Sequence, residues 1–156
     1  MNKINNWLIE VKEQTVGDNW DDKVSAEFLN KAPSVLFSAV TSNTQHEAIS
    51  YWLEICQRLE QFHHYSGNEE LAFRYMQFCY CKVQELAIAA NQDEAIKRWS
   101  IKKLEIMIIN MLDFCQQQTT LAWHDKRHQL INDHVLFMQS ISHQNLSLGS
   151  VIQTPH

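Results

Sequence analysis

The sequence predicts an all-α fold, an antiparallel up-down-up-down four-helix bundle over about residues 45–143 with additional short N-terminal helices. Only three glycines and two prolines interrupt 156 residues, which is far below their usual share. From residue 45 onward, apolar residues recur at alternating spacings of three and four, the period of an amphipathic helix. Few turn-forming residues and a sustained helical period together favour long helices over short strands.

The length of the chain fits one domain with its own hydrophobic core and is short for two. We therefore expect a single helical domain over residues 1–156. Within it, short helices in 1–43 should pack on the bundle, which takes up 44–143. The remaining segment, 145–156, has no helical period and is predicted to be a loose tail.

The N-terminal segments are less regular than the bundle. The stretches "INNWLIEV" and "DDKVSAEFLNKA" are typical of short amphipathic helices, with Asp21 or Asp22 as the N-cap of the second. Pro33 is well placed as the first residue of a third helix, "PSVLFSAVTS", because its fixed φ suits a first helical turn. These helices should lie across the bundle or cover one open face.

The first two bundle helices are predicted from apolar seams over 49–63 and 72–90. Thr44 stands where a capping box would begin the first of them. Gly67, in "YSGN", can take the left-handed conformation that ends a helix. The short turn around it makes the two helices antiparallel neighbours.

The third and fourth seams cover 101–115 and 123–141 and are separated by "QQQTT". Between them the apolar register slips by one residue, which is ~100° of helix rotation. An uninterrupted helix cannot absorb that slip and still face one core. We therefore predict a break there, with Thr119 or Thr120 as the N-cap of the last helix.

Composition makes several classes of partner improbable. The net charge of −5 provides no positive field for nucleic acid. No window approaches 18 consecutive apolar residues, so no membrane span is expected. The N-terminus lacks the apolar core of a secretory signal, so a cytoplasmic location with four reduced cysteines is expected.

In antiparallel helices, side chains at equal distances from the shared end of the bundle lie at the same level, where they could bind one metal ion. Cys56, Cys79 and His128 fall at similar levels, and thiolate and imidazole groups bind zinc. Cys115 or His124 could be a fourth ligand. However, the chain has neither a CxxC nor a HExxH motif, and cysteine is common in ordinary cores. Inert buried thiols are the favoured interpretation, and no metal or cofactor is expected.

Catalytic motifs are missing from the sequence. It contains no glycine-rich phosphate loop, no Glu-x-x-His pair of a diiron bundle and no nucleophile motif. We therefore expect a protein that is not an enzyme and has no catalytic residues.

Polar and surplus apolar residues indicate where the bundle could bind something. Arg127 and His134 interrupt the fourth seam, and a buried charge needs a partner. That partner could be supplied within the chain, by a second subunit or protein, or by a small ligand. Four apolar residues off the seams should pack on the N-terminal helices or on a dimer mate: Phe73, Tyr80, Ile106 and Ile109.

The leading hypothesis is a non-enzymatic helical bundle that acts by binding protein, as a regulator, adaptor or inhibitor, and forms a homodimer. The alternative is a bundle that binds a small ligand or metal ion in its core near Cys56, Cys79, Arg127 and His128. A filled interior at that level favours the first hypothesis, and a polar cavity with Arg127 pointing inward favours the second.

Overall fold

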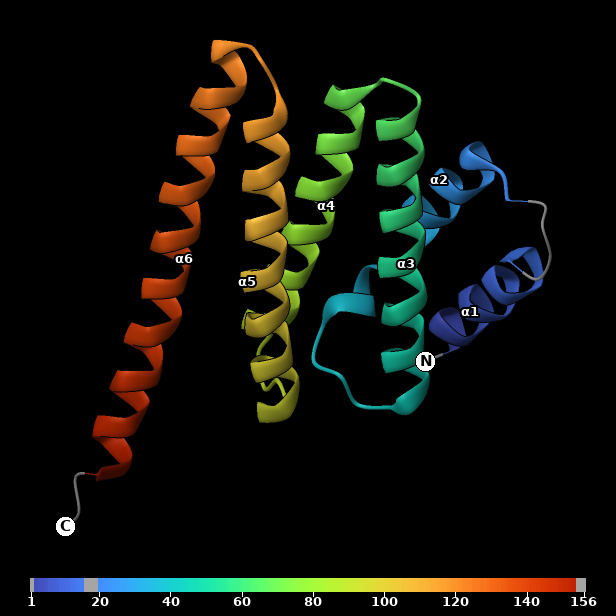
Figure 1. Cartoon of the computed structure of the whole chain (residues 1–156). Helices are drawn as coiled ribbons and strands as arrows, with labels where there is room; N and C mark the ends of the chain where they lie inside the picture. Colours follow the sequence, from blue (N-terminus) through green and yellow to red (C-terminus); the bar gives the residue numbers. More distant parts are fainter. Residues whose placement is uncertain (1, 16–19, 154–156) are drawn as a thin grey trace. The chain divides into compact units, whose positions relative to one another are not determined.

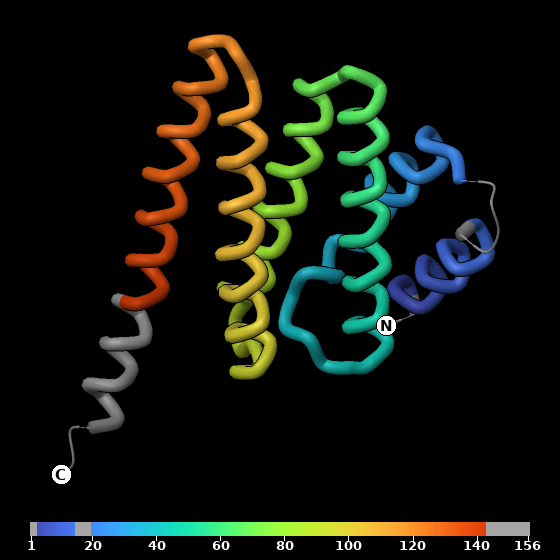
Figure 2. The backbone as a smooth tube through the Cα atoms, viewed as in Figure 1, coloured from blue at the N-terminus to red at the C-terminus, as the bar shows by residue number. Residues whose placement is uncertain are grey.

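The computed structural model describes the backbone of residues 2–15 and 20–153 (Figures 1 and 2). Over these residues it contains six α-helices, one 3-10 turn and no strand, so the all-α class is confirmed. The chain forms two compact units, Met1–Glu105 and Ile106–His156, with the boundary inside one helix. The up-down-up-down order of four bundle helices and the single domain over 1–156 stay predictions.

The first two helices are α1 (Asn2–Thr15) and α2 (Asp22–Lys31), at the two sites where the sequence predicted short amphipathic helices. Trp7 joins them, because its indole Nε1 donates a hydrogen bond of 2.9 Å to the carbonyl of Phe28. Both helices pack against the third helix of the chain. The N-terminal region therefore belongs to the core of the first unit.

Asp21 is the N-cap of α2, one of the two predicted candidates. Its carboxylate accepts from the backbone N–H groups of Lys23, at 2.8 Å, and Val24, at 3.2 Å. Replacing Asp21 with alanine should lower the free energy of unfolding by about 1 kcal/mol, measured by urea denaturation. Asp21→Asn keeps the accepting oxygen and should be nearly neutral. Equal losses in both variants would instead assign the effect to the charge at the helix N-terminus.

The predicted third helix at "PSVLFSAVTS" is only a 3-10 turn, η1 (Ser34–Phe37), preceded by Pro33. Two buried glutamine side chains bind the backbone of this turn and of the residues that follow it. Gln45 Nε2 donates to the carbonyls of Leu36 and Ser38, and Gln92 Oε1 accepts from the N–H of Val40 at 2.9 Å. These side chains satisfy backbone groups that a longer helix would pair internally.

The long helices α3 (Asn43–Tyr65) and α4 (Glu69–Ile88) lie side by side and antiparallel (Figure 1). The Ser42 hydroxyl caps α3 by accepting from the N–H of Gln45 at 3.1 Å, so the N-cap lies two residues before the predicted Thr44. Gly67 has φ +79°, which confirms the predicted left-handed turn between them.

Trp52, on α3, lies at the centre of the first unit with 1% of its surface exposed. Its ring meets the rings of Phe37 at 4.9 Å and Phe78 at 5.2 Å, both nearly edge to face. Its indole Nε1 donates to the carbonyl of Leu29 at 3.5 Å. One side chain thus contacts α2, η1 and α4, which makes it the packing centre of the unit.

The last two helices are α5 (Glu94–Gln117) and α6 (Leu121–Gln153). Three residues separate them, so the predicted break at "QQQTT" is confirmed. The sequence predicted a loose tail without a helical period over 145–156, whereas α6 continues to Gln153, and no proline lies between Leu121 and Gln153. Residues 154–156 lie outside the described residues. None of the described helices combines the length and apolar character that crossing a bilayer requires.

Candidate functional site

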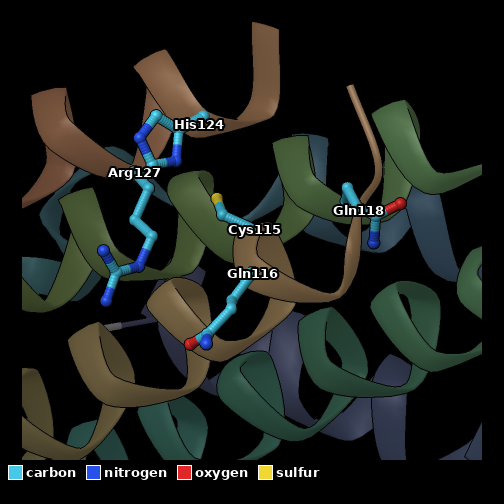
Figure 3. Close-up of a pocket in the computed structure, with 5 residues that line it drawn as sticks. All are labelled: Cys115, Gln116, Gln118, His124 and Arg127. Carbon is cyan, nitrogen blue, oxygen red and sulfur yellow. The ribbon is translucent and has the colours of Figure 1, made fainter. Parts of the chain in front are cut away.

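A small polar pocket lies at the turn between α5 and α6, entirely within the second unit (Figure 3). The end of α5 and the residue after it contribute Cys115, Gln116 and Gln118, and the first two turns of α6 contribute His124 and Arg127. Because His124 and Arg127 are three residues apart, they project from one side of the helix. The cavity volume is about 180 Å³.

Arg127 reaches this pocket with a guanidinium group that is incompletely paired. Its Nε is buried and has no hydrogen-bond partner among the described residues. Leaving a buried donor unsatisfied typically costs about 1–3 kcal/mol, and more for a charged group. The sequence left three partners open for Arg127: a group within the chain, a second subunit or protein, and a small ligand. For the Nε–H group, the described residues provide no partner within the chain.

Cys115 does not provide a negatively charged partner for the Arg127 guanidinium. Its side chain is buried, with 2% of its surface exposed. Burial raises the pKa of the Cys115 thiol, although the positive charges of Lys126 and Arg127 act in the opposite direction. A thiol with a raised pKa is neutral at physiological pH and is a poor nucleophile.

His124 is paired with His128 on the surface of α6. Their Nε2 atoms are 3.3 Å apart, and their rings are nearly perpendicular with centroids 4.8 Å apart. Both residues are exposed. His128, a candidate metal ligand, therefore contacts another histidine one turn away instead of lining a buried site.

Cys56 and Cys79, the other two metal candidates, do come together within the first unit. The hydrogen bond with Cys79 raises the pKa of Cys56, and burial adds to that rise; the Cys56 thiol also donates to the carbonyl of Tyr75 at 3.3 Å. No group of three His, Cys, Asp or Glu side chains in the described part of the chain could hold a metal ion. None of the three candidate ligands, Cys56, Cys79 and His128, therefore belongs to such a group.

The four surplus apolar residues separate into two pairs. Phe73 and Tyr80 on α4 are buried, with 1% and 7% of their surfaces exposed. Ile106 and Ile109 on α5 are 59% and 58% exposed. Only the second pair is open on the surface of this chain to a dimer mate or another protein.

Comparisons with known proteins provide no relative. No family, curated protein or solved structure matches this chain. An all-helical fold by itself implies no function. The pocket and the exposed apolar surface therefore carry the functional inference.

The apolar surface of α6 is the second candidate site. Trp123 is buried against Phe114, with ring centroids 5.5 Å apart. After Trp123, none of the side chains described over 124–142 is buried, although an amphipathic helix normally buries one apolar stripe. The apolar residues in that range are half-buried or exposed: Leu130, Ile131, Val135, Leu136, Phe137, Met138 and Ile141.

Sequence reasoning found part of these sites. The sequence indicated that Arg127 faces inward. It also indicated Cys115 and His124, but only as possible metal ligands. It missed Gln116 and Gln118 in the pocket. Their position at the end of a helix, next to a predicted break, was the available signal, because helix ends gather side chains from two elements in one place.

Proposed function

We propose that this chain is a non-enzymatic protein-binding module that self-associates as a homodimer through α6. The observation that supports the proposal is the absence of a buried side chain over the described part of α6 after Trp123. Burial of apolar surface contributes about 25 cal/mol per Å². A helix that leaves so much apolar surface accessible gains stability when another surface covers it.

One stripe of α6 is best suited to this contact. Ile131, Val135 and Met138 follow one another at spacings of four and three, so they lie on one side of the helix. Val135 is 45% exposed, and the other two are half-buried. We call these three residues the α6 stripe. The exposed pair Ile106 and Ile109 adds apolar surface to the same unit.

The charges of α6 favour a second copy of this chain as the partner. The helix has two acidic residues, Asp125 and Asp133, and two basic residues, Lys126 and Arg127. No Asp, Glu, Lys or Arg follows Asp133 in the sequence. A surface without net charge does not repel an identical surface, and a two-fold dimer requires that self-compatibility.

Light scattering at micromolar concentration tests the proposal. The wild-type chain should have twice its chain mass of 18.3 kDa. Val135→Glu brings a charge from each copy into the apolar contact and should weaken association at least about tenfold, because an unpaired buried charge is costly. Gln129→Glu makes the same charge change about 120° away around the helix and should remain dimeric. A monomeric wild type, or equal dissociation of both variants, contradicts the proposal.

A further inference from the structure

We propose that the pocket at the turn between α5 and α6 is a binding site for a small oxyanion, the phosphate or carboxylate group of a ligand. The pocket uses His124 and Arg127, and the α6 stripe begins at Ile131. The two sites use different side chains, although Arg127 lies one helical turn before Ile131 on the same side of α6.

The donor in this site is the Arg127 guanidinium. It presents five N–H groups in a rigid fork and accepts no hydrogen bonds. Its Nε is buried and unpaired among the described residues. The fork of a guanidinium matches the spacing of two oxygens in a carboxylate or phosphate. An oxyanion would satisfy the buried N–H and neutralise the charge in one step.

The lining of the pocket has no anion of its own. Among its five residues there is no Asp or Glu, and the Cys115 thiol is neutral because burial raises its pKa. Figure 3 shows the Arg127 and His124 side chains on one side of the pocket and the Cys115 sulfur across from them. The imidazole of His124 and the carboxamide of Gln116 are further polar groups that line the same space, whereas the Gln118 carboxamide donates to the carbonyl of Phe114 at 3.1 Å.

The size of the pocket limits the ligand. A cavity of about 180 Å³ is smaller than the roughly 300–1,000 Å³ of typical drug-sized ligand sites. A phosphate or a short carboxylate can enter, whereas a whole nucleotide cannot be enclosed. The site therefore recognises the charged group of a ligand more than its body.

The basic neighbour Lys126 provides a matched control. Its ammonium lies over the Trp123 ring, 4.3 Å from the centroid, and it does not line the pocket. Lys126→Gln and Arg127→Gln remove the same charge from adjacent positions. Only Arg127→Gln removes the buried N–H.

The test follows the NMR signals of the backbone N–H groups of Gln116, Gln118 and His124, which line the pocket in every variant, while inorganic phosphate, or separately acetate, is added to the full chain at constant ionic strength. Saturation with a Kd of about 1 mM is expected for at least one anion. Arg127→Gln should weaken binding at least tenfold, whereas Lys126→Gln should change it less than about twofold. Saturation by phosphate alone assigns a phosphate site, and saturation by acetate alone assigns a carboxylate site.

Two results overturn the proposal. One is the absence of saturable binding of either anion to the wild-type chain. The other is an equal loss in the Lys126 and Arg127 variants, which reveals general electrostatic attraction instead of a built site. Arg127→Lys, which retains the charge without the fork, is the second variant if Arg127→Gln does not fold; it too should bind at least about tenfold more weakly.

Discussion

Replacing Trp52 with alanine should lower the free energy of unfolding by about 3–5 kcal/mol, the range for large aromatic residues in a core. Trp52 is 1% exposed and meets the rings of Phe37 and Phe78. Alanine leaves a cavity between three elements and removes the donor to the Leu29 carbonyl. Guanidinium unfolding followed by circular dichroism measures the loss.

Trp99 provides the control for that measurement. It is 37% exposed on α5, and its ring meets only the ring of His46 among the described aromatic contacts, at 6.4 Å between centroids. Trp99→Ala should cost less than about half of the loss in Trp52→Ala, because more than a third of the Trp99 side chain is in water and its removal opens no enclosed cavity. Equal losses for the two tryptophans would show that Trp52 is not the packing centre of the first unit.

Replacing Gln45 with leucine should have the second largest effect, about 2–4 kcal/mol, because it leaves several polar groups of the backbone unpaired. Gln45 is 2% exposed. Its carboxamide donates to the Leu36 and Ser38 carbonyls and accepts from the Thr41 N–H. Leucine fits a similar volume but satisfies none of these groups.

Gln57→Leu makes the same change at an exposed position on the same helix and should stay within about 0.5 kcal/mol of the wild type. Amide exchange adds a local measurement, since the Thr41 N–H should exchange faster in Gln45→Leu and not in Gln57→Leu. If Thr41 exchanges at the wild-type rate in both variants, Gln45 does not hold this segment.

The helices could be predicted because the apolar spacing that forms them recurs along the sequence. Apolar spacing and few breakers define α3 to α6, and the register slip locates the break before Leu121. The end of α6 could not be predicted from apolar spacing, because residues after 145 have no clear period and Gly149 falls within the helix. The short turn η1 was also missed, because it depends on side chains far away in the sequence.

The candidate sites depend on single contacts, which leave no period in the sequence. Gln45 and Gln92 are buried, yet nothing in the sequence distinguishes them from the exposed glutamines. The seam placed Arg127 inward, but only the arrangement of α5 and α6 shows that its Nε has no partner in the described structure.

In the homodimer that we propose, two copies of this chain meet through α6. Isotope-filtered NMR on an equal mixture of ¹³C-labelled and unlabelled chains detects contacts between copies and no others. We expect intermolecular signals from the methyl groups of the α6 stripe, Ile131, Val135 and Met138, to protons of α6 in the other copy. Dimers whose intermolecular signals arise from other surfaces, or a sample without such signals at concentrations well above micromolar, would contradict it.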